Sequence, residues 1–208
     1  TLTMAVVVGS ASLIGRFLVP SSIIAKPVIY LYPEEEERVT VKLDLKGEYE
    51  FSYPKYASDI GGWDVYASPD GNITDPRDGR TYSYIFWEGL SLRKPYDMST
   101  GWVVEDVDTV EFLRDKLATF GFTEKEYNEF IVYWAPILQK NKFNLIHFAT
   151  SEYEEIAPLD VNPKPDSILR VLMAYKPVAY KMEVTPQEIK PVTREGFVLV
   201  EWGGTLVK

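Results

Sequence analysis

The sequence predicts an α+β domain with a mostly antiparallel, sandwich-like β-sheet body and a central two-helix hairpin packed on one face. Three observations predict this class. Apolar and polar residues alternate with a period of two in several stretches of residues 26–91, which is typical of half-buried strands. The pattern changes to a helical period over residues 105–138, and strand character returns between residues 143 and 202. We expect one domain in residues 26–208 and a separate segment in residues 1–25.

Residues 1–25 form the clearest compositional unit of the chain. They carry one charge, Arg16, and the composition changes abruptly at Lys26. An apolar run that ends in a small residue, Ala25, is similar to a signal peptide. The segment could instead be a membrane anchor, although Arg16 near its middle would cost about 2.5–3.5 kcal/mol on insertion scales. Its β-branched residues are also consistent with an extended strand.

An apolar strand needs a partner for its backbone groups and its side chains. If the partner is the chain's own domain, the segment is the first core strand. If the partner is a neighbouring copy, the segment adds a strand to that copy, and repetition builds a filament. The acceptor groove would then lie between strand edges near residues 197–202. The predicted assembly residues are Met4, Val6, Val8, Leu13, Ile14, Phe17, Leu18 and Val19.

Strand patterns follow one another along the body of the chain. Residues 38–45, for example, place valine and leucine on one face and polar groups on the other. The acidic run at residues 34–37 is expected to be a solvated turn. Residues 68–80 are expected to hold two tight turns at their Asp-Gly pairs, because their spacing does not match a calcium-binding loop. The predicted strands are 27–32, 38–45, 49–53, 63–67, 81–87, 143–149, 168–175 and 197–202.

Two helices are predicted at the centre of the chain. Residues 105–120 place apolar side chains every three or four positions, with acidic residues first and Gly121 at the stop position. Thr123 and Glu126 match a capping box for the second helix, which Pro136 should bend or end near residue 135. The acidic, proline-rich residues 151–167 are expected to form a long surface loop.

Composition and motifs argue against several classes of function. The formal net charge of −9 disfavours nucleic-acid binding, which depends on Lys and Arg. Because the chain has no cysteine, it has no disulfide, thiolate nucleophile or thiolate metal site. Its single histidine, His147, lies in an apolar strand, as a core or sheet-face residue would. We therefore predict no catalytic residue, cofactor or metal site.

The remaining candidates for catalytic or ligand-binding groups are carboxylates that adjoin aromatic residues in the sequence. Two carboxyls across a cleft could hydrolyse a glycan, and aromatic faces could stack on sugar rings. The alternative interpretation is that the five tryptophans, at positions 63, 87, 102, 134 and 202, are mainly core or interface residues. The possible ligand surface comprises Trp63, Trp87, Glu88, Glu201 and Trp202.

Seven strings of the sequence resemble a family of uncharacterised bacterial proteins, many of them secreted or surface-associated. The strings are AKPVIYLYP, GWDVYASPDG, YSYIFWEG, NEFIVYW, NLIHFAT, PDSILRVLMAYKP and GFVLVEWGG, and they span residues 25–204. The resemblance implies an exported protein, located outside the cell or on its surface. It brings no catalytic residues that transfer to positions of this chain.

Together these features favour a non-enzymatic role. We predict an exported structural or interaction protein, a cell-surface fibre or assembly subunit joined through its apolar N-terminal strand, with copies of itself as partners. The alternative is a cell-envelope glycan-binding module or a carboxylate-dependent glycan hydrolase. We expect no nucleic-acid partner, and the sequence leaves membrane contact open.

Overall fold

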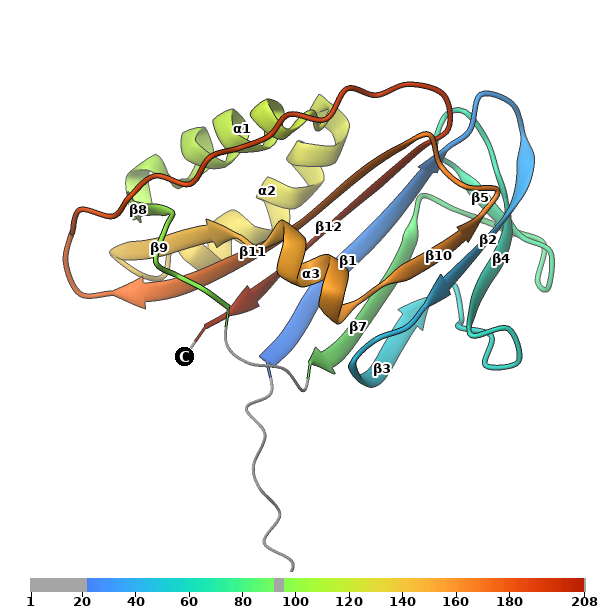
Figure 1. Cartoon of the computed structure of the whole chain (residues 1–208), viewed down its shortest axis with the longest axis horizontal. Helices are drawn as coiled ribbons and strands as arrows, with labels where there is room; N and C mark the ends of the chain where they lie inside the picture. Colours follow the sequence, from blue (N-terminus) through green and yellow to red (C-terminus); the bar gives the residue numbers. More distant parts are fainter. Residues whose placement is uncertain (1–21, 92–95, 208) are drawn as a thin grey trace, which may run out of the picture.

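The computed structural model describes residues 22–91 and 96–207, which fold into two β-sheets with helices (Figure 1). The strands are β1 (Ser22–Tyr32), β2 (Glu37–Leu43), β3 (Gly47–Tyr53), β4 (Gly62–Ala67), β5 (Ile73–Asp75), β6 (Arg80–Tyr82), β7 (Ile85–Ser91), β8 (Trp102–Glu105), β9 (Phe143–Phe148), β10 (Leu159–Asn162), β11 (Ser167–Val178) and β12 (Val198–Leu206). The helices are η1 (Asp106–Asp108), α1 (Thr109–Phe120), α2 (Glu124–Leu138) and α3 (Thr150–Ile156). The predicted assembly residues, Met4 to Val19, lie outside the described residues.

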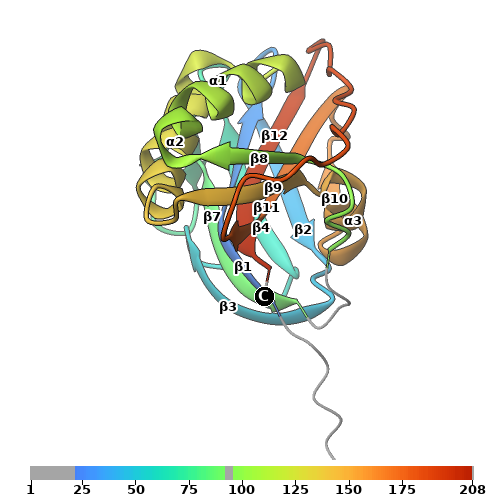
Figure 2. The same ribbon diagram turned by 90° about the vertical axis from the view of Figure 1, so that its left-hand side faces the viewer.

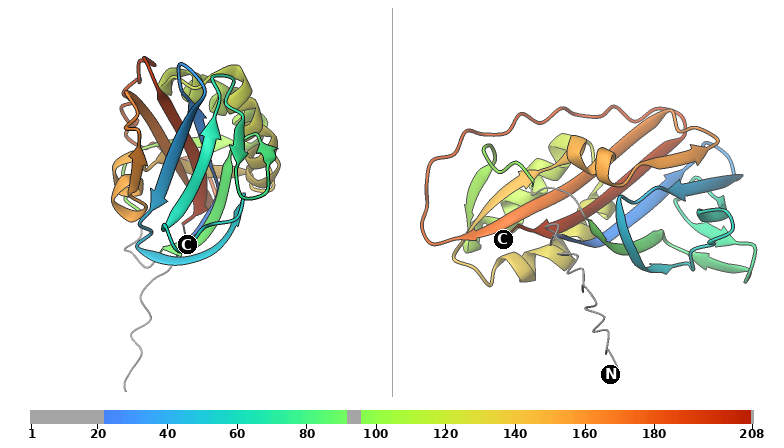
Figure 3. Two further views of the ribbon diagram at one scale, coloured as in Figure 1. Left: turned by 90° about the vertical axis from the view of Figure 1, so that its right-hand side faces the viewer. Right: turned by 60° about the horizontal axis from the view of Figure 1, so that its bottom comes forward.

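The larger sheet has seven strands in the order β3-β7-β1-β12-β11-β9-β8, and the smaller has five in the order β10-β2-β4-β5-β6. One core lies between the two sheets and contains Trp63, Trp87 and Tyr153 of α3. A second core lies between the larger sheet and α1 and α2, and contains Phe130 and Trp202. The two long helices cover one face of the larger sheet, and further views show the same layers (Figures 2 and 3). The predicted β-rich, sandwich-like α+β architecture is confirmed.

The larger sheet is mixed because β12 has one antiparallel and one parallel neighbour. It pairs with β1 on one side and with β11 on the other, so that Leu199 lies opposite both Leu31 and Ile168. A strand that is paired along both sides has no free backbone edge. Residues 198–202 therefore have no free backbone edge of their own. The outermost strands of the two sheets are β3, β8, β10 and β6.

The segment predicted as one strand at residues 81–87 is two strands in different sheets. Tyr82 of β6 and Ile85 of β7 are both buried, three positions apart, so a side-chain period of two cannot hold between them. The chain therefore turns a corner and passes from the smaller sheet to the larger one. This corner places the ring of Tyr84 5.4 Å from that of Tyr30 on β1.

The long loop predicted at residues 151–167 is also wrong, because it contains α3 and β10. Tyr153 and Ile156 are buried three positions apart, which orients one face of α3 toward the core between the sheets. Leu159 and Val161 then alternate with exposed residues in β10, which pairs with β2. Most of the acidic residues occupy exposed positions, and their abundance concealed both elements.

The helical pair follows the prediction except at its two ends. Residues 102–105 belong to β8, so the first helix starts after them at η1 and α1. Pro136 lies inside α2, which continues to Leu138. The helix can continue because a proline near its end removes only one backbone hydrogen bond, and the burial of Leu138 stabilises the last turn. No helix within residues 22–91 and 96–207 has the length and apolar character needed to cross a bilayer.

The capping box at the start of α2 is present as predicted. Thr123 Oγ1 accepts from the Glu126 backbone N–H at 3.5 Å, and Glu126 Oε2 accepts from the Thr123 N–H at 2.7 Å. We expect Thr123→Ala to lower the free energy of unfolding by about 1 kcal/mol. Thr119→Ala, at an exposed position of α1, should change it by less than about 0.5 kcal/mol. Chemical denaturation measures both, and equal effects would contradict a capping role.

Candidate ligand-binding site

A distorted point in β1 marks the first candidate site. The register of β1 against β12 shifts between Ala25 and Val28, and a corresponding shift occurs against β7. Lys26 has a φ of 55°, a left-handed conformation that among the described residues is otherwise confined to glycine. Pro27 follows it, and a residue before proline favours extended backbone instead. Strain of this kind persists where packing enforces it, and it clusters at functional sites.

The side chain of Lys26 is surrounded by aromatic rings. Its Nζ lies 5.1 Å from the centroid of Tyr84, 4.8 Å from that of Phe86 and 5.9 Å from that of Tyr133. It also lies 3.4 Å from the Tyr84 hydroxyl oxygen. In the described part of the chain, no carboxylate lies within 4.0 Å of this ammonium. The charge of the Lys26 ammonium is therefore stabilised mainly by the faces of aromatic rings, which attract cations.

A pocket of about 530 Å³ adjoins these rings, between the start of β1, the β6–β7 corner and α2. We call it the Lys26 pocket. Glu129 contributes a carboxylate, whose Oε2 accepts a hydrogen bond of 2.8 Å from the Tyr30 hydroxyl. The lining residues are Lys26, Ser83, Tyr84, Asn128, Glu129, Val132, Tyr133 and Trp202.

The buried hydroxyl of Tyr30 supports the Glu129 carboxylate. Burial raises the pKa of Tyr30 well above its usual value, and the charge of Glu129 adds to the rise. Among the described residues, the indole N–H of Trp202 has no hydrogen-bond partner of good geometry. It is nevertheless close to the Tyr30 hydroxyl and acts to lower the pKa of Tyr30, against the effect of burial. Tyr30 therefore stays protonated and donates its hydrogen bond to Glu129 throughout the physiological pH range.

A second carboxylate and more aromatic surface lie beside the pocket. Glu88 Oε1 accepts from the backbone N–H of Lys26 at 3.3 Å. Burial, followed by the charge of Glu88, raises the pKa of Tyr133. The ring of Phe51 on edge strand β3 lies 5.9 Å from Phe86 and is 55% exposed. Exposed ring faces next to fixed hydrogen-bonding groups can bind flat, hydroxyl-rich ligands such as sugars.

The residues predicted as a ligand surface do not form one surface. Trp63 and Trp87 are buried between the sheets, whereas Trp202 is buried on the helix side of the larger sheet. Glu201 is fully buried and lies with Trp87 in the core. Glu88 and Trp202 alone of the five belong to the neighbourhood of the Lys26 pocket. Trp134 is buried too and Trp102 is half-buried, which agrees with a mainly core role for the tryptophans.

Glu201 is the centre of a buried hydrogen-bonded network. Its Oε1 accepts from Trp87 Nε1 at 2.9 Å and from the Tyr153 hydroxyl at 2.7 Å, and its Oε2 accepts from Arg170 Nε at 2.6 Å. Arg170 Nη2 donates to the Ala157 carbonyl at 2.6 Å. Because the protein itself supplies partners to both carboxylate oxygens, Glu201 holds the structure together and does not face a substrate.

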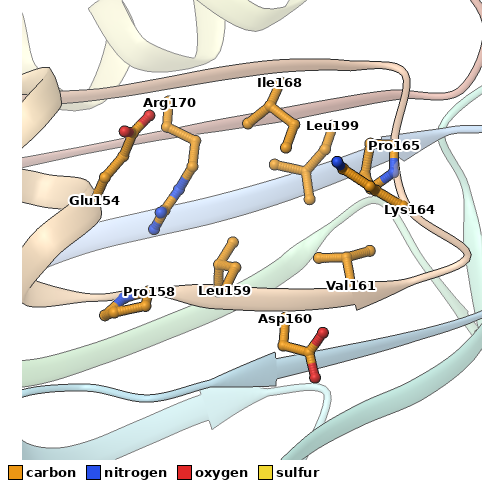
Figure 4. A pocket seen from close by; sticks show the side chains of 10 residues that line it. All are labelled: Glu154, Pro158, Leu159, Asp160, Val161, Lys164, Pro165, Ile168, Arg170 and Leu199. Carbon is orange, nitrogen blue, oxygen red and sulfur yellow. The ribbon is translucent and has the colours of Figure 1, made fainter.

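A second hollow, which we call the β10–β11 cleft, lies between these two strands (Figure 4). It has a volume of about 510 Å³. Figure 4 shows Glu154 and Arg170 at one end and Lys164 and Pro165 at the other, with apolar side chains between them. Leu159 and Val161 project from β10, facing Ile168 and Leu199 of the larger sheet.

His147 is a buried sheet residue, as expected. Its Nδ1 lies 3.0 Å from the carbonyl oxygen of Thr100. Within residues 22–91 and 96–207, no three His, Asp or Glu side chains are grouped so as to hold a metal ion.

Four pocket residues carried no clear functional signal in the sequence: Lys26, Tyr84, Glu129 and Tyr133. They come from three separate regions of the chain, which only the fold brings together. One signal was available in retrospect. Glu129 and Tyr133 are four positions apart on α2, so they share a face next to the buried stripe of Phe130 and Trp134.

Comparison with curated proteins finds a similarity over part of the chain. No family model matches the chain, and no solved structure matches it. A curated protein of Butyrivibrio fibrisolvens, described as "Uncharacterized protein in bglA 3'region", is 46% identical over 65 residues. The match covers 31% of this chain and 65% of that protein, just under two thirds of its length.

Proposed function

We propose that this protein is a glycan-binding module of the cell envelope that binds sugar rings at the Lys26 pocket. One observation carries the proposal. A strained, non-glycine residue presents an ammonium group over three aromatic rings, beside two glutamates that the fold holds in place. Lys26 is strained in that conformation, and strain of this kind is concentrated at binding and catalytic sites.

The polar groups of the pocket suit hydroxyl recognition. Lys26 and Asn128 can donate hydrogen bonds, and Glu129 in the pocket and Glu88 beside it can accept them. Tyr84 and Tyr133, which line the pocket, offer the parts of their rings that Lys26 does not cover as apolar surface for a sugar ring.

The proposal concerns binding and not hydrolysis. A glycosidase needs one carboxyl group that donates a proton to the leaving group and a second that acts as nucleophile or base. Glu129 in the pocket accepts from the Tyr30 hydroxyl, and Glu88 beside it accepts from the Lys26 backbone. An acceptor role is what a binding site for hydroxyl groups requires.

Tyr84→Ala is expected to weaken glycan binding about tenfold, because loss of one stacking ring removes about 0.5–1.5 kcal/mol and the partner of Lys26 is lost with it. The measurement is calorimetric titration of the full chain with oligosaccharides first selected on an array of bacterial envelope glycans. Tyr180→Ala is the matched control, since Tyr180 is an exposed tyrosine that does not line the pocket.

Binding by the control variant should equal that of the unchanged chain. Failure of the unchanged chain to bind any glycan on the array would refute the proposal. Full binding by a correctly folded Tyr84→Ala variant would also refute it, and circular dichroism establishes the folding.

A further inference from the structure

The helix side of the larger sheet carries an exposed aromatic surface at its β3 end. Phe86 and Glu88 of β7 are half-buried, and they lie opposite Tyr53 and Phe51 of β3 in the strand register. Residues directly opposite each other place their side chains on the same face. No described residue of β3 contributes to the core beneath α1 and α2, which lie toward the other end of the sheet (Figure 1). We call these four residues the β3–β7 face.

The β3–β7 face continues the Lys26 pocket. The ring of Phe51 lies 5.9 Å from that of Phe86, and the centroid of Phe86 lies 4.8 Å from Lys26 Nζ. Glu88 links the two regions, because it lies opposite Phe51 and accepts a hydrogen bond from the Lys26 backbone N–H. A ligand that extends out of the pocket over Phe86 therefore meets the ring of Phe51.

Two aromatic side chains of this face are exposed. Phe51 and Tyr53 are each 55% exposed, although aromatic residues usually bury most of their large apolar surface. The ring of Tyr53 is held by an edge contact with Tyr82, at 4.8 Å between centroids. A single exposed apolar side chain needs no explanation, whereas a group of them beside a pocket indicates a binding surface.

The sequence of β3 disfavours strand addition by a second copy, which is the other use of an exposed outer strand. Glu48 and Glu50 are exposed on β3, and charged side chains on an edge strand oppose pairing with another strand. The register of β3 also shifts between Tyr49 and Phe51, which interrupts the regular edge. The β3–β7 face therefore suits a ligand that stacks on rings better than one that pairs with the backbone.

We propose that the ligand is a linear glycan chain, with one sugar ring in the Lys26 pocket and further rings stacked on Phe51 and Tyr53. This inference rests on the proposed glycan binding at the pocket, and it adds the class of glycan, a chain of several sugars. Aromatic ring faces provide the apolar surface on which successive sugars stack. Glu88 accepts hydrogen bonds from sugar hydroxyl groups between the pocket and Phe51.

The dependence of binding on glycan length tests this inference. The probes are oligomers of one to four sugars, of the glycan type that binds on the array, titrated calorimetrically into the full chain. Affinity of the unchanged chain should increase with the number of sugars. Phe51→Ala should weaken binding of the four-sugar oligomer by about twofold to tenfold, because one stacking ring is lost. Binding of the shortest oligomer that binds should stay unchanged.

Three further variants separate stacking from folding. Phe51→Trp retains an aromatic ring and should bind the four-sugar oligomer as the unchanged chain does. Phe51→Leu retains an apolar contact with Phe86 but has no ring, so it should bind as weakly as Phe51→Ala. Tyr66→Ala is the matched control, because Tyr66 is a strand residue of the smaller sheet that is 41% exposed. It should bind every oligomer as the unchanged chain does.

Equal weakening of the shortest and the four-sugar oligomers by Phe51→Ala would overturn the inference, because Phe51 would then act only on the pocket. Full binding of the four-sugar oligomer by Phe51→Ala, together with its loss in Tyr84→Ala, would also overturn it but leave glycan binding at the pocket intact. If the unchanged chain bound no glycan, both proposals would be refuted. Light scattering that found a dimer dissociated by Phe51→Ala would assign the face to a second copy and overturn the inference.

Discussion

Glu201→Ala is expected to lower the free energy of unfolding by about 3–5 kcal/mol, because it leaves the Arg170 guanidinium buried without its counter-charge. The side chains of Arg170 and Glu201 are 5% and 0% exposed, so water cannot replace the lost carboxylate. Trp87 and Tyr153 would each lose the acceptor of their hydrogen bond at the same time. A loss of this size is a large fraction of the stability of an ordinary domain.

Urea denaturation followed by tryptophan fluorescence measures this effect. Asp64→Ala is the matched control, since it breaks a pair with Arg38 whose side chain is 60% exposed, and should cost less than about 1 kcal/mol. The double variant that combines Arg170→Met with Glu201→Gln removes both buried charges and should recover part of the lost free energy of unfolding. An effect of Glu201→Ala no larger than that of Asp64→Ala would show that the network does not stabilise the core.

Phe130→Ala is expected to cost about 3–5 kcal/mol, because it opens a cavity between α2 and the larger sheet. Phe130 is fully buried, and its ring lies 5.1 Å from that of Trp202 and 6.1 Å from that of Trp134. Its neighbours on α2, Glu129 and Tyr133, line the Lys26 pocket. Loosening this helix should therefore weaken glycan binding as well as stability.

Thermal and urea denaturation measure the stability change, and the same glycan titration measures the binding change. Lys125→Ala is a control on the same helix, since Lys125 is exposed and does not line the pocket, and it should alter stability by less than about 0.5 kcal/mol. A cost for Phe130→Ala that matched the control would mean that α2 is not anchored through this ring.

Local patterns predicted the elements whose side chains keep a single period. β2 alternates faithfully between buried and exposed positions, and α2 begins at the capping box that its sequence displays. Predictions were wrong where the alternation of side chains is interrupted, and where the composition of a segment suggested a loop. The corner between β6 and β7 interrupts the alternation, and the acidic residues of α3 and β10 resemble those of a loop.

Amino-acid order alone determined the class of fold, the two long helices and most of the strands, because burial of one face imposes a period that is visible locally. It also favoured a mainly core or interface role for the tryptophans. Tertiary structure decided that Glu201 is a core residue and Glu88 is not, although both adjoin a tryptophan in the sequence. It also decided that Lys26, Tyr84 and Glu129 share a pocket, since positions 26, 84 and 129 meet only through sheet pairing and helix packing. Contacts between distant residues depend on register and layer order, which no local pattern contains.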